Sequence, residues 1–204
     1  MMDYKLENKK TYDLYAQKFD EKFRDHFQQF VKKEADIFVD TLRGKEIVDV
    51  GSGSGNHAQY FQGKGFQVLC VDFSKPMLKL CQEKGLKTKL MDIEEWELPE
   101  NSADGIWAYA CLLHLPKNKI KKVIDNFRKT LKTEGILALF VKEGVGEKFE
   151  TNEKYPGTKR LFVYFNDTEV RELFASDFEI LHSSHTKIKN KYIFLNYIMR
   201  LKLP

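Results

Sequence analysis

The sequence lacks any long hydrophobic run. Its longest apolar stretches are short, such as residues 136–141, and none approaches the ~20 residues that a helix needs to span a bilayer. The N-terminal stretch MMDYK has neither an apolar core nor a small-residue cleavage site, so it does not read as a secretory signal. We therefore expect a cytoplasmic protein that does not associate with membranes.

Cysteine is scarce and is not arranged for metal binding. The sequence has three cysteines, Cys70, Cys81 and Cys111. Their number is odd and no pair has CxxC spacing, which indicates reduced, mostly buried thiols rather than disulfides. No Cys/His cluster has the spacing of zinc ligands, so no metal site is expected.

Internal repeats, low-complexity tracts and linkers rich in Pro, Gly or Ser are also missing, so the 204 residues are expected to form one domain. The charge bias is weak: 34 basic and 30 acidic residues give a net charge of +4. A bias of this size does not by itself indicate a nucleic-acid-binding protein.

Short apolar runs alternate with helical segments from residue 46 onward. Strands are expected at residues 46–50, 66–71, 86–91, 103–110 and 136–142. Helices are expected at residues 56–62, 74–84 and 117–131, with Gly135 stopping the last of them. This alternation predicts a parallel sheet with helices on both faces and a ligand site at the carboxyl ends of the strands.

The two ends of the chain have different patterns. The first 30 residues carry an aromatic stripe at helical spacing, formed by Tyr12, Tyr15, Phe19, Phe23, Phe27 and Phe30. Near the C-terminus, a helix at residues 167–174 precedes β-rich runs at 178–186 and 191–201, joined by a polar turn at 187–190. We predict an α/β, Rossmann-like doubly wound sheet of seven strands with a C-terminal antiparallel hairpin and an N-terminal helical lid.

A glycine-rich turn follows the first expected strand, with the sequence Asp49-Val-Gly-Ser-Gly-Ser-Gly55. A strand, glycine turn and helix bring free backbone N–H groups to one point, where a ligand can approach closely. Asp72 ends the second strand, 21 residues after Gly51, where a carboxylate can bind both ribose hydroxyls. These features indicate an adenosine-type cofactor, either NAD or S-adenosylmethionine.

Three details favour S-adenosylmethionine over NAD. The glycines follow a GxGxG pattern rather than GxGxxG. Asp49 would repel a pyrophosphate but suits the ammonium group of a methionine moiety. The C-terminal hairpin has no counterpart in a simple dinucleotide-binding domain.

Several segments together resemble the class I S-adenosylmethionine-dependent methyltransferases, in particular their small single-domain members. IVDVGSGSGN at residues 47–56 resembles the first motif of the family, and VDFSKPML at 71–78 resembles the segment after its second strand. Further matches lie at residues 91–93, 98–104, 112–116 and 131–135. The resemblance covers about residues 40–145, in the family's order and spacing.

The resemblance implies S-adenosyl-L-methionine as cofactor and assigns a role to each matching position. The implied cofactor-binding residues are Asp49, Gly51, Ser52, Gly53, Gly55, Asn56, Asp72, Phe73, Met77, Asp92, Ile93, Ala110 and Tyr12. Asp49 and the Ala110 carbonyl would face the ammonium group, Asp72 the ribose, and Asp92, Ile93 and Met77 the adenine. Tyr12 resembles a lid tyrosine, although a core aromatic would show the same pattern.

The catalytic candidates are His114 and Glu143, each near the end of an expected strand. Either would act as a general base that removes a proton from the methyl acceptor; a structural role for His114 is the competing interpretation. Glu147, Arg160, Tyr164 and Asn196 are candidates to line the acceptor pocket.

The domain is expected to divide into a helical lid (residues 1–40), a cofactor-binding core (41–145) and a substrate-side insert with the hairpin (146–204). We expect a monomer or homodimer that methylates an O, N or carboxylate acceptor on a small molecule. No Asn/Asp-Pro-Pro-aromatic motif follows the fourth strand and no Pro-Cys motif occurs, which disfavours amino methylation of adenine or glutamine and attack on a pyrimidine ring.

Two alternatives stay open. An RNA methyltransferase resembling the tRNA wobble-uridine carboxyl methyltransferases would use the lysines of residues 117–132 to contact the backbone. A non-catalytic S-adenosylmethionine-binding protein would keep the cofactor motifs without turnover.

Overall fold

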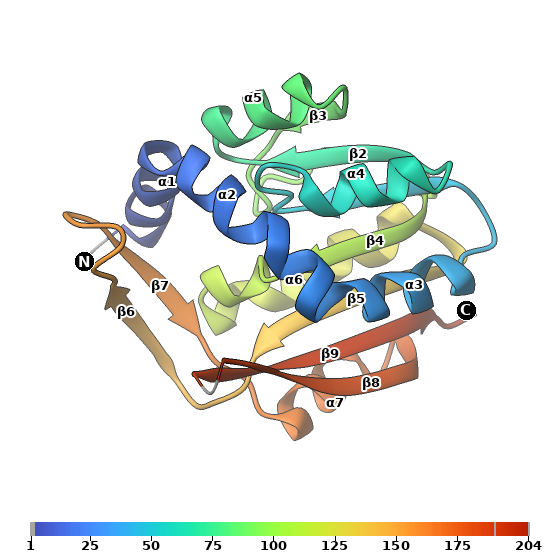
Figure 1. The fold of residues 1–204 in the computed structure, drawn as a ribbon. Helices are drawn as coiled ribbons and strands as arrows, with labels where there is room; N and C mark the ends of the chain where they lie inside the picture. Colours follow the sequence, from blue (N-terminus) through green and yellow to red (C-terminus); the bar gives the residue numbers. More distant parts are fainter. Residues whose placement is uncertain (1–2, 190, 204) are drawn as a thin grey trace.

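A seven-stranded sheet forms the centre of the computed structural model, which describes residues 3–189 and 191–203. The strands are β1 (Glu46–Val50), β2 (Gln67–Asp72), β3 (Lys87–Leu90), β4 (Ala103–Tyr109), β5 (Leu131–Lys142), β8 (Phe178–Ile188) and β9 (Tyr192–Leu201). Their order is β3-β2-β1-β4-β5-β9-β8 (Figure 1). All neighbours are parallel except β9, which is antiparallel to β5 and β8. The predicted Rossmann-like sheet with a C-terminal hairpin is confirmed; Asn190, in the predicted turn, lies outside the described residues.

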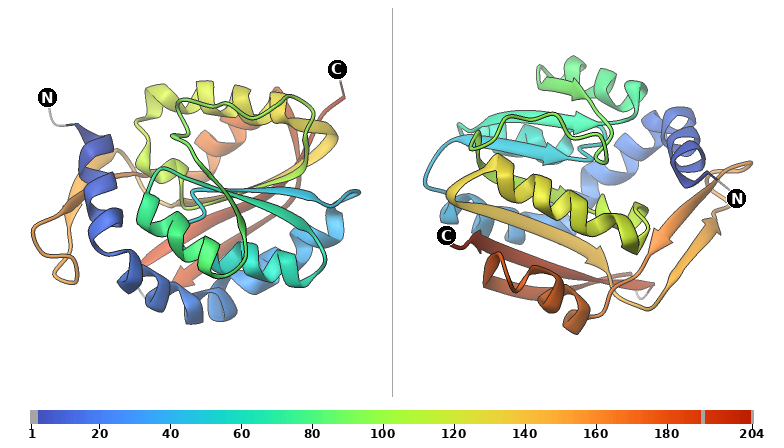
Figure 2. Two further views of the ribbon diagram at one scale, coloured as in Figure 1. Left: turned by 90° about the horizontal axis from the view of Figure 1, so that it is seen from above. Right: turned by 180° about the vertical axis from the view of Figure 1, so that it is seen from behind.

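Helices cover both faces of this sheet. Helices α3 (Lys32–Thr41), α4 (Asn56–Gly63) and α5 (Lys75–Glu83) pack on one face, and α6 (Lys117–Thr130) and α7 (Asp167–Phe174) on the other (Figures 1 and 2). Successive strand side chains point to opposite faces of the sheet. Ile47 therefore belongs to the apolar core beneath α3, α4 and α5, while Val48 and Val50 belong to the core beneath α6 and α7. Near-continuous apolar strands follow from burial on both faces.

The N-terminal segment crosses the carboxyl ends of the strands before it reaches the sheet (Figure 1). It comprises α1 (Tyr4–Leu14), α2 (Ala16–His26) and a π-helical turn, η1 (Phe27–Val31). Asp3 caps α1 by accepting the backbone N–H groups of Lys5 and Leu6. The aromatic stripe is helical as predicted, but it is interrupted at Tyr15, whose φ of −120° is not helical, and by the π-helical turn.

The junction between α6 and β5 differs from the prediction. The helix ends at Thr130, and β5 begins at once with Leu131, which pairs with Ala103 of β4. The expected stop at Gly135 is wrong, because the chain has already entered the strand there and bends at Glu134, whose φ is +58°. Pairing with β4 overrides the helical pattern at this position.

The expected substrate-side insert is a second, two-stranded sheet. Strands β6 (Glu147–Thr151) and β7 (Lys159–Val163) pair antiparallel, from Glu147 opposite Val163 to Thr151 opposite Lys159. The pair stands away from the main sheet and reaches α1, which β7 contacts (Figures 1 and 2). Leu161, Phe162 and Val163 are buried, so this hairpin has its own apolar contacts.

Within residues 3–189 and 191–203, no helix has the length and apolar character that crossing a bilayer requires.

Candidate cofactor and acceptor site

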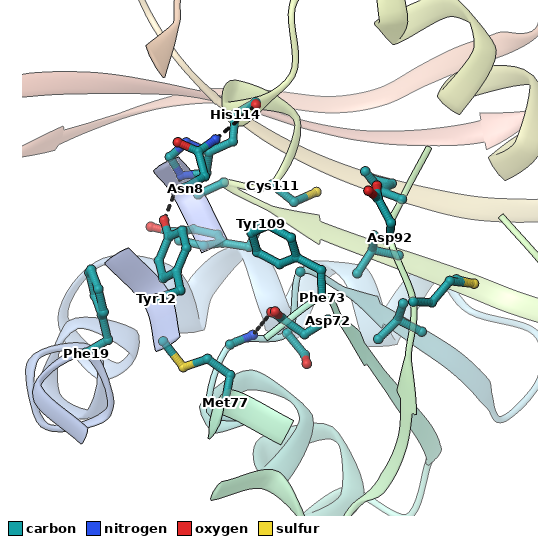
Figure 3. Close-up of a pocket in the computed structure, with 18 of the residues that line it drawn as sticks. Asn8, Tyr12, Phe19, Asp72, Phe73, Met77, Asp92, Tyr109, Cys111 and His114 are labelled. Carbon is teal, nitrogen blue, oxygen red and sulfur yellow. Dashed lines mark hydrogen bonds between the residues drawn. The ribbon is translucent and has the colours of Figure 1, made fainter. Parts of the chain in front are cut away.

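A cavity lies above the glycine turn at the carboxyl ends of the strands, the edge predicted from the topology (Figure 3). Helices α1 and α2 form its other wall. Eleven of the predicted cofactor residues line it: Tyr12, Gly51, Ser52, Gly53, Asn56, Asp72, Phe73, Met77, Asp92, Ile93 and Ala110. His114 lines it as well, whereas Asp49, Gly55 and Glu143 do not.

The three glycines of the turn have different surroundings. A Cβ atom on Gly51 would lie 2.6 Å from the Cβ of Cys111, and one on Gly55 would lie 2.6 Å from a methyl of Leu86. Nothing lies within 4 Å of the corresponding position on Gly53. Gly51 and Gly55 are therefore required by packing, and Gly53 leaves open space on the cavity side.

Asp72 ends β2 beside the turn. Its Oδ2 accepts the Gly53 N–H at 2.9 Å and its Oδ1 accepts the Ser74 N–H at 2.9 Å (Figure 3). Burial raises the pKa of Asp72 to about 6, against the opposing effect of these N–H donors. The carboxylate is thus fixed in position at the cavity wall, ready to accept further hydrogen bonds.

Asp49 lies behind the turn, almost fully buried. Its Oδ2 has no hydrogen-bond partner among the described residues. Burial, together with the negative charge of Asp72, raises the pKa of Asp49 to about 8. A buried carboxylate oxygen without a donor is costly, so a cationic or N–H group arriving nearby would stabilise it.

Asp92, expected to meet adenine, already has a partner. Its Oδ2 lies 2.8 Å from the Nζ of Lys5 on α1, and its Oδ1 accepts the Glu94 N–H. Tyr4 donates to Glu94, which ties the start of α1 to the same loop. The N-terminal helix therefore closes the cavity over the predicted adenine end.

Tyr12, His114 and Arg160 form one hydrogen-bonded chain. The Tyr12 hydroxyl lies 2.7 Å from His114 Nε2 and accepts from Arg160 at 3.1 Å, while His114 Nδ1 lies 2.7 Å from the Leu161 carbonyl oxygen. Burial, helped by Arg160, lowers the pKa of His114 to about 3. A neutral ring then donates from Nδ1 to Leu161 and accepts the Tyr12 proton at Nε2, so both nitrogens are occupied.

The structure does not bring Glu143 to the cavity. Its side chain is exposed, and its backbone pairs with Ile193 and Phe165. The preceding residue, Lys142, is buried instead and packs over Phe162. The alternation of side chains along β5 decides this, since adjacent residues face opposite sides.

The other acceptor-pocket candidates are dispersed. Glu147 is exposed and accepts the Lys117 N–H, Tyr164 donates to Glu150, and Asn196 donates to Ser184 and Thr186 within the C-terminal hairpin. Arg160 alone lies beside the cavity, through its bond to Tyr12.

Several cavity residues had no signal in the sequence. They are Tyr4, Lys5, Asn8, His57, Tyr109 and Cys111; Phe19 and Phe23, which also line the cavity, belong to the predicted aromatic stripe. His57 Nδ1 accepts the Trp107 indole N–H at 3.0 Å, and burial lowers its pKa to about 3. Asn8 lies in a helix, where nothing in the pattern distinguishes it, yet it donates to the His114 carbonyl oxygen (Figure 3). It also accepts the Leu161 N–H. Its position depends on the docking of α1.

Ala110 shows that the backbone here is unusual. It has a φ of +56° directly after β4, a conformation rare outside glycine. Such backbone strain concentrates where a site needs a particular carbonyl or N–H direction.

Known proteins share these features. A family model described as a methyltransferase domain matches residues 47–135. A methyltransferase from Geobacillus sp. (strain WCH70) is 26% identical over 139 residues, covering 62% of this chain and 56% of that protein. A tRNA (carboxymethyluridine(34)-5-O)-methyltransferase of Arabidopsis thaliana is 29% identical over 106 residues, covering 51% of this chain and 26% of that protein. The chain thus spans about half and a quarter of these relatives.

The fold is shared more widely than the sequence. The crystal structure of Burkholderia thailandensis 1,6-didemethyltoxoflavin-N1-methyltransferase, with its substrate and S-adenosylhomocysteine bound, superposes with a TM-score of 0.70 at 22% identity. The match covers 92% of this chain and 87% of that one. Residues 47–135 thus match a methyltransferase domain, and the sheet has the fold of a solved methyltransferase that binds S-adenosylhomocysteine.

Proposed function

We propose that this chain is an enzyme that transfers a methyl group from S-adenosyl-L-methionine to a small molecule. The observation that carries the proposal is the cavity above Gly53, with the Asp72 carboxylate on its wall and the unpartnered oxygen of Asp49 behind it. These residues fit the cofactor: open space at one glycine, an acceptor for ribose hydroxyls and an anion for an ammonium group. When bound, the cofactor would supply a methyl group from its sulfonium, with S-adenosylhomocysteine as the leaving group.

The chain's residues would mainly bind, orient and exclude water. Asp72 holds the ribose, Asp49 and the Ala110 carbonyl balance the ammonium, and Met77 lies against the adenine. For Asp92 to reach the adenine amino group, its carboxylate must be shared with Lys5 or released by it. Helices α1 and α2 would shield the reacting atoms from solvent. The cavity wall would hold the acceptor in line with the methyl group for displacement.

Neither of the predicted general bases is placed to remove the acceptor's proton. His114 is neutral, but its Nε2 must give up the hydrogen bond from the Tyr12 hydroxyl before it can take a proton from the acceptor. Glu143 would have to turn from its exposed position. We therefore assign His114 to positioning Tyr12 and keep Glu143 as a prediction; methyl transfer does not always need a base.

A small acceptor is favoured over RNA by ion pairs at three of the lysines between residues 117 and 132, two in α6 and one in β5. Lys117 pairs with Glu169, Lys119 lies 3.9 Å from Glu94, and Lys132 lies 3.0 Å from Asp104. Lysines already paired with carboxylates contribute little to binding a phosphate backbone. The structural neighbour from Burkholderia, named for a small heterocyclic substrate, agrees with this choice.

Calorimetric titration with S-adenosylhomocysteine tests the cofactor assignment. Wild-type protein should bind it, and Asp72→Ala should bind at least about tenfold more weakly, because the ribose loses a charged acceptor. Glu179→Gln, an exposed change on the far hairpin, serves as the control and should bind normally. Wild-type affinity in Asp72→Ala would refute the ribose role, and binding of NAD instead would refute the cofactor.

An RNA methyltransferase is the second candidate, favoured by the tRNA-modifying relative from Arabidopsis. A gel-shift titration with bulk tRNA at low and moderate salt decides between the two. A salt-dependent shift would favour RNA, and no shift at low salt would exclude it. Release of S-adenosylhomocysteine in the presence of an acceptor separates either enzyme from a binding protein without turnover.

A further inference from the structure

Three cationic side chains converge beside the aromatic wall of the cavity. Lys22 comes from α2, Lys142 from the last position of β5, and Arg160 from β7. The aromatic residues between them include Phe19 and Phe23, which line the cavity itself. Elements distant in the sequence thus place positive charge at the end of the sheet where an acceptor would enter.

Lys142 is the most unusual of the three. Its residue is 9% exposed, and among the described residues its ammonium has no hydrogen-bond partner and no carboxylate within 4.0 Å. It lies 3.7 Å from the ring centroid of Phe162 and 4.7 Å from that of Tyr192. Burial lowers the pKa of Lys142 to about 8, and the charges of Arg160 and Lys22 act in the same direction.

Arg160 is in a similar position. It donates to the Tyr12 hydroxyl, and its guanidinium carbon lies 4.9–5.5 Å from the ring centroids of Phe162, Phe19, Tyr155 and Tyr12. Within the described part of the chain it has no carboxylate partner. Cation–π contacts offset part of the cost of these charges, but they do not neutralise them.

The carboxylate whose charge acts on Lys142 is already paired with other side chains. Glu150, which attracts Lys142 only at a distance, accepts from Tyr164 and lies 3.1 Å from Lys148. Lys22, on the exposed side, lies 4.7 Å from the Phe23 ring centroid and has no acidic partner among residues 3–189 and 191–203. A site that gathers cations without anions is incomplete until an anion binds.

We infer that the methyl acceptor is a small anion with a flat ring, whose carboxylate or phosphate is held by Lys142 and Arg160 while its ring lies against the aromatic residues around them. This inference rests on the proposed function and specifies its substrate class. A planar ring would lie against Phe19 and Phe23, which line the cavity, and the two cations would fix its orientation through charge-assisted hydrogen bonds. A polymer backbone is disfavoured, because Lys142 is too deeply buried to reach one.

The test uses matched charged and neutral probes on the full chain saturated with S-adenosylhomocysteine. Calorimetry compares benzoate and phenyl phosphate with benzamide, which has the same ring without the charge. Wild-type protein should bind at least one of the anions about tenfold or more tightly than benzamide. Preference for phenyl phosphate over benzoate, or the reverse, would identify the anionic group. Equal affinity for all three probes, or no binding of either anion, would overturn the inference.

Two variants connect this preference to the cations. Lys142→Met keeps the length of the side chain and removes its charge, and should reduce the anion preference to about threefold or less. Lys142→Arg should restore most of the preference. Lys121→Met, on the exposed side of α6, is the matched control and should leave it unchanged. Full preference in Lys142→Met would overturn the assignment of this residue.

The cofactor's own carboxylate is the competing partner for these cations. If they served it, Lys142→Met would lose about tenfold in S-adenosylhomocysteine affinity, which would overturn the inference. Unchanged affinity for S-adenosylhomocysteine together with a lost anion preference supports it. Failure of wild-type protein to bind S-adenosylhomocysteine would instead contradict the proposed function, so the two failures are distinguishable. Should Lys142→Met not fold, the wild-type probe comparison and Arg160→Met carry the same test.

Discussion

At the scale of single residues, the site depends on small differences in surroundings rather than on residue type. Gly51 and Gly53 both have positive φ values, +63° and +54°. Only Gly51 is enclosed by a neighbouring side chain, that of Cys111. The same residue type is therefore enclosed by packing at one position and leaves open space two residues later.

Alanine substitutions should separate these two roles. Gly51→Ala combines a left-handed backbone with an overlap against Cys111, and should cost about 2–4 kcal/mol in the free energy of unfolding. Gly53→Ala meets no atom, so it should cost about 1 kcal/mol yet lower S-adenosylhomocysteine affinity by about tenfold or more. Urea unfolding and calorimetry measure the two effects. Equal stability losses in both variants would contradict this distinction.

At the scale of elements, the N-terminal helices are joined to the core by polar contacts beside the glycine turn. Asp20 of α2 is 3% exposed and accepts from Lys84 at 2.6 Å and from Arg24 at 3.0 Å. Lys84 also donates to the Ser54 carbonyl oxygen and to Asn56 Oδ1, each at 2.8 Å. Lys84 therefore connects α2 to the cofactor turn, so closure of the cavity and order in the turn are linked.

Removing the charge of Asp20 should weaken both the closure of the cavity by α2 and the order of the glycine turn. Burial alone would raise the pKa of Asp20, but bonds from Lys84, Ser54 and Arg24 hold it at about 2. Asp20→Asn should lose about 2 kcal/mol of stability at pH 7, and the wild-type advantage should disappear as pH falls from about 4 toward 2. Glu179→Gln, at an exposed pair 3.9 Å apart, should change stability by less than about 0.5 kcal/mol. An equal loss in both variants, measured by urea unfolding, would argue against a special role for the Asp20 contacts.

At the scale of the whole molecule, buried carboxylates near the cavity make the empty protein less stable than its core would allow. Asp49 has its pKa raised from 3.8 to about 8, so the folded protein holds a proton that the unfolded chain releases. Stability from this group is therefore greatest at low pH and falls as pH rises toward 8. A bound ammonium group would reverse the preference by favouring the ionised carboxylate.

Asp49 should thus contribute about 2 kcal/mol more to the stability of the ligand-free protein at pH 6 than at pH 8, seen as the difference in pH dependence between wild type and Asp49→Asn. The variant isolates this contribution, because the buried His57 and His114, whose pKa values are lowered to about 3, destabilise the folded protein as pH falls toward 6. Affinity for S-adenosylhomocysteine should rise over the same interval, because its ammonium group prefers the ionised Asp49. Urea unfolding at the two pH values, with and without S-adenosylhomocysteine, measures both effects. The same slope in wild type and Asp49→Asn would assign the pH dependence to other groups.

Local pattern determined the parallel sheet, the glycine turn, the position of Asp72 and the C-terminal hairpin. These features depend on residues close in sequence: apolar runs, turn residues and a strand-to-strand spacing. The relation to class I methyltransferases came from the order of such local motifs over residues 47–135. For the same reason, the sequence predicted the cofactor side of the site more fully than the acceptor side.

Tertiary structure decided what depends on contacts between distant segments. The segment that forms β6 and β7 was expected only as an insert. Its pairing as a hairpin and its packing against α1 depend on distant residues and leave no local pattern in the sequence. Glu143 was chosen over its neighbour Lys142, although the pleat of β5 buries the lysine and exposes the glutamate. Lys22, Lys142 and Arg160 come together from three elements, and no periodic pattern in the sequence predicts this. Short-range geometry is encoded residue by residue, whereas the proposed acceptor site forms only once α2, β5 and β7 meet.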